Sequence, residues 1–261
     1  MHGTVAISRV TSGSRMRDVP ANMADRLIVA LDVRSPAEAE GLVNKLDGVV
    51  SFFKINMWLL FAEGTDALID RLIKRGKNIF LDYKMYDIPE TVYGGVERAR
   101  DRGIKFVTVH GYSDIIKAAV KAKGDSDFLK IFTITVLTSM EESDLEDMGY
   151  RGITVKELIE LRVRNSIKHG SDGIIASAAD DPNDIRRIVE SERLLIATPG
   201  VRMEGALTDD HKRLATPAEA IRKGADYIIV GRPILKASDP RGSALELVRQ
   251  MEAGLQPVQT A

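Results

Sequence analysis

The feature that most constrains the fold is a regular alternation of short β-rich runs with helical stretches along most of the chain. Such alternation predicts repeated β-α-β units, in which neighbouring strands run parallel. Eight such units within about 230 residues suit a closed (β/α)8 TIM barrel, an α/β fold, in a single domain. The predicted strands cover about 27–34, 50–56, 78–84, 105–111, 130–138, 172–178, 194–200 and 226–232.

Helix boundaries between these runs carry local signals. SPAEAE offers Ser35 as N-cap with proline next and Glu38 at N3, and Thr216 begins the same pattern in TPAEA. Both match a capping box with proline at the first helical position. ARDRGIKFV, IKHGSDGII and IRKGADYII each pass from a basic helix end through glycine into a strand, as helix C-termini do.

An open doubly wound sheet is the rival architecture. That fold usually carries G-x-G-x-x-G after its first strand, whereas the first run here continues as LDVRSPAE without glycine. No linker divides the chain. We expect a flexible leader over 1–22, one barrel domain over 23–254 and a tail over 255–261. The segment 139–170 is the least regular, and we interpret it as an acidic loop (MEESDLEDMG) followed by one long helix.

Composition excludes several classes of function. The net charge is −1 with no block of like charges, so nothing calls for nucleic acid or an anionic membrane as partner. The roughly 20 consecutive apolar residues of a membrane-spanning helix occur nowhere. The chain has no cysteine, which excludes disulfides and cysteine-based metal sites and fits a cytoplasmic protein.

Two acids and a lysine gather where the third apolar run ends, in FLDYKMYDIPET. Because side chains alternate faces along a strand, Asp82 and Lys84 are expected on one face and Leu81 and Tyr83 on the other. Asp87 follows the strand end. Active sites of α/β barrels lie at this end of the strands, so the motif is a candidate catalytic element.

Two other predicted strands bring charge to the same rim, through Asp32 after the first and Lys54 in the second. In such an alternating array each lysine keeps the acids ionised and each acid keeps a lysine protonated. Fixed charges of this kind need little reorganisation during a reaction. A held ammonium group can stabilise and then protonate a carbanion.

Structural interpretations compete with this one. Asp87, which is followed by Ile88, Pro89 and Glu90, could be a helix N-cap with Glu90 at N3. The Asp82 and Lys84 pair could be a structural ion pair, Asp32 a loop acid, and Lys54 a lysine that extends its charged end to solvent. Each holds singly, but the four positions together favour a functional array.

The seventh and eighth predicted strands end in TPGVR and VGRPI. Gly200 and Gly231 allow close backbone approach to a ligand, and Arg202 and Arg232 can each hold a phosphate bidentately. Loops after these two strands often bind phosphate in barrels. The long polar segment RMEGALTDDHKRLAT between them suits a lid. A phosphorylated small molecule is therefore the expected substrate, with surface arginines on an ordinary turn as the alternative.

DYKMYDIPET resembles the D-x-K-x-x-D-I-P-x-T signature of the orotidine 5′-monophosphate decarboxylase family. LIVALD, FKINMWLLFAEG, TVLTS, TPGVR and VGRPI follow in the family's order and spacing, over roughly 26–250. The resemblance implies a homodimer of (β/α)8 barrels that converts orotidine 5′-monophosphate to uridine 5′-monophosphate and CO2, the last step of de novo UMP synthesis. It implies no metal and no cofactor.

Residue roles follow from the same resemblance. Lys84 resembles the catalytic lysine that protonates C6, and Asp82 the carboxylate that faces the substrate carboxylate. Lys54 and Asp87 complete the catalytic array, with Asp87 supplied by the partner subunit. The implied substrate-binding residues are Asp32 and Lys54 at the ribose, Ile88 and Thr91 of the partner, Thr138 at the pyrimidine, and Arg202, Gly231 and Arg232 at the phosphate.

The sequence departs from the family pattern at two positions. Glu90 stands where many members have asparagine, at a helix start. His211 stands in the lid where glutamine usually reaches both phosphate and base; histidine can still bond a phosphate. We assign no chemistry to His2, His110 or His169, which lack metal-ligand spacing.

Two other functions remain as alternatives. A magnesium-dependent sugar-phosphate decarboxylase or aldolase of the same superfamily, such as a hexulose-phosphate synthase, shares the D-x-K-x-x-D strand. It has a metal-binding acid on the second strand, where this chain has Lys54, and Ala-Gly in place of Ile-Pro. A non-catalytic nucleotide-binding barrel would need Arg202 and Arg232 but not the charge array.

Overall fold

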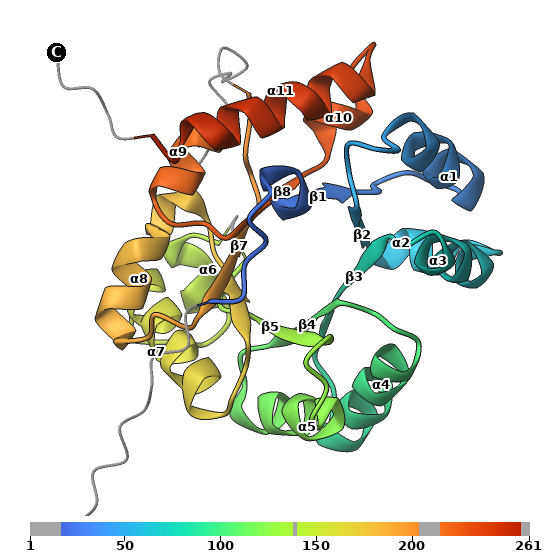
Figure 1. The fold of residues 1–261 in the computed structure, drawn as a ribbon. Helices are drawn as coiled ribbons and strands as arrows, with labels where there is room; N and C mark the ends of the chain where they lie inside the picture. The colour runs from blue at the N-terminus through green and yellow to red at the C-terminus, as the bar shows by residue number, and fades with distance from the viewer. Residues whose placement is uncertain (1–16, 138–139, 204–214, 257–261) are drawn as a thin grey trace, which may run out of the picture.

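A computed structural model describes residues 17–137, 140–203 and 215–256. Eight parallel strands form a closed barrel in chain order, and β8 closes it by pairing with β1. Figure 1 looks along this barrel, with the helices in a ring around the strands. The predicted (β/α)8 architecture and all eight predicted strands are confirmed. The strands are β1 Leu27–Ala30, β2 Phe52–Ile55, β3 Asn78–Met85, β4 Phe106–His110, β5 Lys130–Ile134, β6 Gly173–Ile175, β7 Leu195–Thr198 and β8 Tyr227–Val230.

Helices follow the strands and cover the outside of the barrel. A short 3-10 helix, η1 (Met23–Arg26), precedes β1 and lies at the amino-terminal end of the barrel (Figure 1). The other helices are α1 Pro36–Lys45, α2 Met57–Leu60, α3 Thr65–Lys74, α4 Pro89–Asp101, α5 Ser113–Lys123, α6 Glu142–Asp147, α7 Val155–Lys168, η2 Ala178–Asp180, α8 Pro182–Val189, α9 Pro217–Arg222, α10 Arg232–Leu235 and α11 Pro240–Ala253.

The helix starts predicted at Ser35 and Thr216 are confirmed, with one difference in the capping hydrogen bonds. Thr216 forms the full capping box with Glu219 at the start of α9. Ser35 caps α1 by accepting from the Glu38 amide, but the Glu38 carboxylate accepts from the Arg34 amide instead of closing the box. The glycines Gly103, Gly170 and Gly224, which follow α4, α7 and α9, all have positive φ, which explains glycine there.

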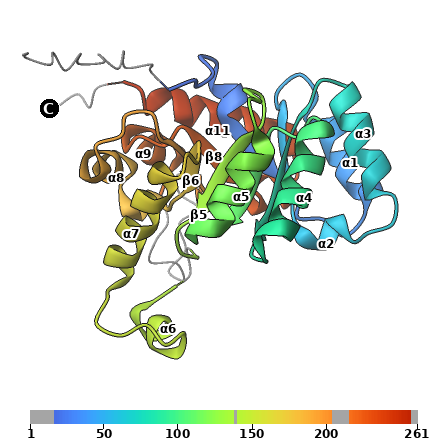
Figure 2. The same ribbon diagram turned by 90° about the horizontal axis from the view of Figure 1, so that it is seen from below.

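The acidic segment after β5 is not wholly a loop. It contains α6, because Glu141 and Asp144 form a reciprocal capping box at its start. Figure 2 shows α6 projecting away from the barrel body on the side of the carboxyl-terminal strand ends. The predicted long helix follows as α7, again with a capping box at Thr154.

The barrel interior is filled by a layer of aromatic rings. Phe52, Phe80, Phe106 and Phe132, from four consecutive strands, are fully or almost fully buried and pack in part edge to face. Side chains two residues further on each strand point the same way. The next inward-facing layer is therefore polar in part, and it consists of Lys54, Asp82, Thr108 and Ile134. The aromatic layer is the floor of the candidate site.

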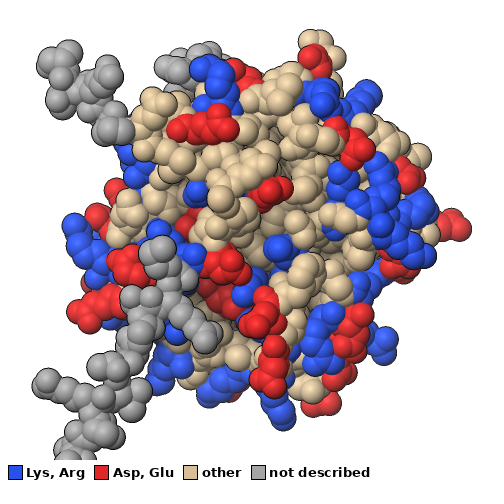
Figure 3. Space-filling model, viewed as in Figure 1, with Lys and Arg blue, Asp and Glu red and all other residues tan. Residues whose placement is uncertain are grey.

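The surface carries both signs of charge. On the face drawn in Figure 3, acidic and basic side chains are interspersed. Among the described residues, no helix is long and apolar enough to cross a membrane.

Candidate active site

Four charged residues from the first three strands meet at the carboxyl-terminal mouth of the barrel. The Asp82 carboxylate lies between two ammonium groups, with Oδ2 3.1 Å from Lys54 Nζ and Oδ1 3.0 Å from Lys84 Nζ. Asp32 Oδ1 is 3.9 Å from Lys54 Nζ. The order Asp32, Lys54, Asp82, Lys84 thus alternates in sign through space, and we call these four residues the charge array.

The backbone of β3 is irregular where it carries the array. Leu81 pairs with Val107 and Met85 with Val109, so three residues of β3 face a single residue of β4. Lys84 has φ +49°, a left-handed conformation that costs a residue with a Cβ about 1–2 kcal/mol. Simple alternation therefore fails at this point, and the bulge sets where the Lys84 ammonium lies.

Electrostatics keep Asp82 ionised. Burial raises the pKa of its carboxyl group, but the nearby ammonium groups of Lys54 and Lys84 outweigh burial and hold the pKa below its ordinary value. A carboxylate fixed between two cations supplies a permanent local field, which suits a reaction that develops negative charge beside Lys84.

A cavity of about 230 Å³ opens beside the array. Lys54, Asp82 and Lys84 line it on one side, and its other walls are apolar. These walls come from the second half of the barrel and consist of Ile134, Val136, Leu137, Ile175, Pro199 and Ile229. An apolar wall opposite fixed charges fits a flat ring with one reactive polar substituent.

The predicted phosphate residues follow β7 and β8, and β8 pairs with β1. The pKa of Arg202 is lowered by burial and by the neighbouring guanidinium group of Arg232, so two cations share this region. Gly231 begins α10, and a Cβ added there would meet Asp32 Oδ2 at 3.1 Å. Because residue 231 is a glycine, its backbone can lie close to the Asp32 carboxylate of the charge array. Gly200 has φ +78°, which requires glycine in the β7 loop.

Residues assigned to the partner subunit do not join the array within one chain. Asp87, Ile88 and Thr91 are exposed. The Asp87 carboxylate accepts from the Ile88 amide at 2.7 Å, yet it does not cap α4, whose N-cap is Ile88 with no side-chain hydrogen bond. The capping interpretation of Asp87 is therefore wrong, because the helix begins one residue too late for it. Thr138 and His211 lie outside the described residues.

Sequence reasoning missed two members of the site. Asn56 donates to Asp32 Oδ1 at 2.8 Å and caps α2 by accepting from the Leu59 amide. Thr108, on β4, donates to Asp82 Oδ1 at 3.0 Å and accepts from the Lys84 amide at 2.9 Å. The signal for both was strand alternation, since Asn56 is two residues after Lys54 and Thr108 two after Phe106.

His110 ends β4 beside the site, and its ring stacks on Tyr86 with centroids 4.4 Å apart. Its Nδ1 is buried and has no hydrogen-bond partner among the described residues. Burial and the nearby Arg162 lower the pKa of His110 below its ordinary value, which favours the neutral ring. Within the described ranges, no three His, Asp or Glu side chains gather as a metal site would.

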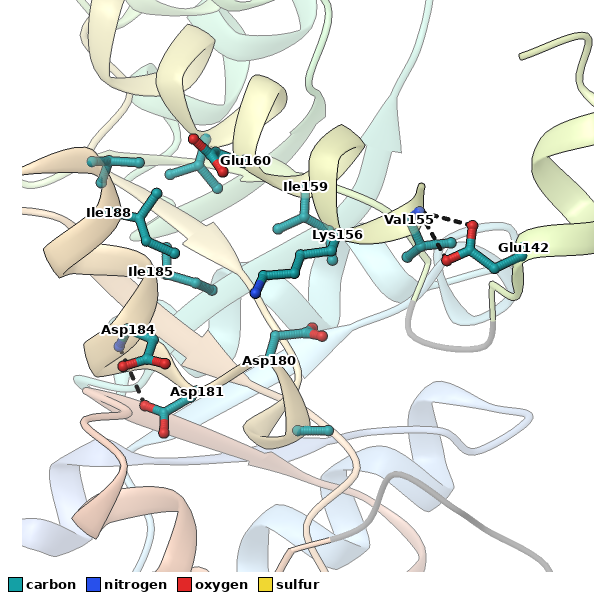
Figure 4. A pocket seen from close by; sticks show the side chains of 13 residues that line it. Glu142, Val155, Lys156, Ile159, Glu160, Asp180, Asp181, Asp184, Ile185 and Ile188 are labelled. Carbon is teal, nitrogen blue, oxygen red and sulfur yellow. Dashed lines mark hydrogen bonds between the residues drawn. The ribbon is translucent and has the colours of Figure 1, made fainter. Parts of the chain in front are cut away.

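A second cleft, of about 290 Å³, lies between α7 and α8 (Figure 4). Ile159 of α7 and Ile185 of α8 form part of its apolar floor. Several of its acids already serve the local fold, since Glu142 accepts from the Val155 amide and Asp181 caps α8. None of the charge array lines it. The cavity at the barrel mouth is therefore the better candidate active site, although it is smaller.

Comparison with known proteins agrees with this geometry. The profile described as "Orotidine 5'-phosphate decarboxylase / HUMPS family" matches residues 25–247. A Rhodopseudomonas palustris protein named orotidine 5'-phosphate decarboxylase is 45% identical over 87% of this chain and 94% of its own length. A Methylobacterium radiotolerans protein of the same name is 43% identical over 88% and 98%.

A solved structure shares the architecture as well. The crystal structure of orotidine 5'-phosphate decarboxylase from Lactobacillus acidophilus superimposes with a TM-score of 0.77 at 31% identity, and the match covers 88% of this chain and all of that one. The barrel, the charge array and these similarities lead to one conclusion: the chain belongs to the orotidine 5'-phosphate decarboxylase / HUMPS family.

Proposed function

We propose that this protein decarboxylates orotidine 5′-monophosphate to uridine 5′-monophosphate and CO2, without metal or cofactor. The observation that carries the proposal is the position of the Lys84 ammonium, 3.0 Å from the mostly buried carboxylate of Asp82, which a second lysine, Lys54, also contacts. Relatives with 42–45% identity carry the name of this decarboxylase, and they support the same substrate.

The reaction needs a stabilised carbanion. The bond between C6 and the carboxylate carbon breaks, CO2 leaves, and the electron pair remains on C6. The ammonium of Lys84 stabilises that charge and then gives C6 a proton, and solvent returns a proton to the amine. Asp82 faces the leaving carboxylate and fixes Lys84, while the apolar cavity wall accommodates the pyrimidine.

The rest of the nucleotide fits the side of the mouth that runs from Lys54 through Asp32 to Gly231. We assign the ribose hydroxyl groups to Asp32 and Lys54, and the phosphate to Arg202, Arg232 and the backbone at Gly231. Thr138 at the pyrimidine and His211 at the phosphate complete the proposed contacts. Phosphate binding is remote from C6, so its binding energy can favour closure around the reacting group.

Homodimerisation is a further part of the proposal. Large apolar side chains are exposed on consecutive loops after β2, β3 and β4, among them Trp58, Phe61, Tyr86, Ile88 and Tyr112. Exposed apolar groups gathered at one end of a monomer mark an interaction surface. Burial of this surface against a second copy would place Asp87, Ile88 and Thr91 of each subunit near the other's site.

The magnesium-dependent alternative is not favoured. In that chemistry an acid on the second strand binds the cation, whereas here Lys54 Nζ stands 3.1 Å from Asp82 and would repel it. We place the protein in the cytoplasm, at the last step of UMP synthesis, with no nucleic acid or membrane as partner.

The test is the ultraviolet absorbance of orotidine 5′-monophosphate mixed with the protein, with and without a chelator. We expect the orotate band to disappear equally fast with and without the chelator. An unchanged band would overturn the decarboxylase, and loss only without chelator would indicate metal-dependent chemistry.

The dimer has its own test. Lys84→Ala and Asp87→Ala proteins, each inactive alone, are unfolded together and refolded as a mixture. If Asp87 acts across the interface, each mixed dimer has one intact site, and about a quarter of wild-type activity returns, because half of the dimers are mixed. No recovery in a mixture shown to contain mixed dimers would place Asp87 and Lys84 in the same subunit's site.

A further inference from the structure

The bulge in β3 raises the question of what holds it. Asp82, Tyr83 and Lys84 face one residue of the neighbouring strand, Thr108 of β4. Lys84 has a left-handed backbone. Such conformations persist only where the surroundings fix them. Strand pairing does not do so here, because the ladder between β3 and β4 skips from Leu81 to Met85.

The Thr108 hydroxyl group occupies the gap in the ladder. It accepts from the backbone amide of Lys84 at 2.9 Å and donates to Asp82 Oδ1 at 3.0 Å. Thr108 has no exposed surface, so water does not replace these bonds. One side chain thus replaces the missing ladder hydrogen bond and ties the backbone of Lys84 to the carboxylate that its own ammonium contacts.

These bonds complete the surroundings of Asp82. Its Oδ1 contacts the Thr108 hydroxyl and the Lys84 ammonium, and its Oδ2 contacts Lys54. Thr108 and Lys54 are buried in the same inward-facing layer as Asp82, whereas the Lys84 side chain is partly exposed at the mouth. The carboxylate is therefore held from several directions before any substrate binds, which is what electrostatic preorganisation requires.

We infer that Thr108 is a positioning residue for the decarboxylation: its hydroxyl group fixes the β3 bulge and thereby the separation of the Lys84 ammonium from the reacting carbon. The inference rests on the proposed function. Thr108 contacts no substrate atom in this scheme and acts only through Asp82 and Lys84. Loss of the Thr108 hydroxyl should therefore lower kcat. It should not weaken substrate binding, because the proposed ribose and phosphate contacts come from other strands.

The test compares Thr108→Val with Thr108→Ser. Valine has nearly the shape of threonine but neither hydrogen bond, and serine keeps the hydroxyl. We expect Thr108→Val to lower kcat by about a hundredfold, as a displacement of about 1 Å can, with KM and the affinity for uridine 5′-monophosphate little changed. Thr108→Ser should recover most of the loss.

Thr133→Val is the matched control. Thr133 is equally buried, on the adjacent strand β5, and its hydroxyl bonds Ser171 away from the charge array. We expect it to lower the melting temperature but to leave kcat unchanged. Thr108→Ala serves in place of Thr108→Val if the latter does not fold, since a smaller side chain cannot clash.

Three outcomes would overturn the inference: wild-type kcat in Thr108→Val or Thr108→Ala, a Thr108→Ser protein as slow as Thr108→Val, or an equal loss in Thr133→Val. Inactivity of the wild-type protein would instead refute the proposed function, and the inference with it.

Discussion

Two clusters of charged side chains lie at opposite ends of the barrel. At the carboxyl-terminal end, Asp82 lies between Lys54 and Lys84. At the amino-terminal end, Asp226 at the start of β8 binds the guanidinium group of Arg186 from α8, and its other oxygen lies 3.1 Å from Arg17 Nε. Both clusters pair one aspartate with two cations.

The clusters differ in how completely the protein satisfies them. Arg186 also donates to the carbonyl groups of Leu194 and Gly224, and Asp226 accepts from the Ile196 amide. The Asp226 and Arg186 side chains are 4% and 2% exposed. Every charged atom of that pair thus faces protein, and the cluster fastens α8 to β7 and β8.

The charge array at the other end is left open. The Lys84 side chain is 44% exposed and that of Asp32 is 38% exposed, and both border the mouth cavity or its rim. The comparison teaches that residue type alone does not separate a structural cluster from a catalytic one. The open side, where charged atoms meet a cavity instead of backbone, makes the difference.

The largest effect is expected at the open end. Lys84→Ala removes the proposed proton donor and carbanion stabiliser, so turnover should fall by more than about a thousandfold. Product nucleotide binding should remain measurable, and the melting temperature should change little because the ammonium is partly exposed. The orotate absorbance assay and calorimetric titration measure these quantities. Near-normal turnover would remove the basis of the mechanism.

A substitution in the Asp226 and Arg186 cluster should lower the free energy of unfolding. Arg186→Ala leaves the Asp226 carboxylate buried beside fewer cations, which costs about 3–5 kcal/mol in similar cases. Urea unfolding measures this loss. The control is Arg187→Ala on the same helix, whose exposed pair with Asp184 contributes about 0–1 kcal/mol. Equal stability of the two variants would contradict the structural role of the closed cluster.

A smaller effect should separate the two sides of the mouth. Arg202→Ala should lower kcat/KM for orotidine 5′-monophosphate by about ten- to a hundredfold, because a charged hydrogen bond to the phosphate is lost. With the phosphate-free nucleoside orotidine as substrate, the same variant should match the wild-type protein. A similar loss with both substrates would show that Arg202 acts on something other than the phosphate.

The smallest effect concerns pH. The pKa of Asp82 is lowered in the folded protein, so its ionised form contributes stability above the unfolded pKa, and this contribution is lost as the pH falls through the folded value. The stability difference between wild-type protein and Asp82→Asn should therefore be constant from neutral pH to about pH 5 and shrink as the pH falls further toward about pH 3. Urea unfolding across that range measures it, and a constant difference would argue against a lowered pKa.

Most of the fold followed from the sequence. Apolar runs of strand length, capping residues such as Thr216 and helix-ending glycines are local signals, and each acts over a few residues wherever the chain lies. The predicted strands were longer than the observed ones at several ends, because pairing in a tilted barrel stops before the apolar run does. The acidic segment after β5 was assigned to a loop because its helix, α6, has a single buried residue and little apolar periodicity.

The charged members of the site were also visible in the sequence. Asp32, Lys54, Asp82 and Lys84 stand out because charge at the end of an apolar strand is costly unless it is paired or used. Parallel strands in chain order then bring consecutive strand ends together. The alternation of strands and helices already predicted this topology, so it was enough to predict that the four residues meet at one rim.

Only the tertiary structure decided the details on which chemistry depends. Hydrogen bonds from the Thr108 hydroxyl hold the bulge in β3 and the left-handed Lys84. They join Thr108 to residues that lie 24 and 26 positions earlier in the sequence. Strand alternation predicts that Thr108 points into the barrel and Thr133 away from it, but it does not predict that the Thr108 hydroxyl meets Asp82 and Lys84. The physical reason is that local patterns fix which way a side chain points, whereas the partner it meets depends on the register of neighbouring strands, which forms only when the barrel closes.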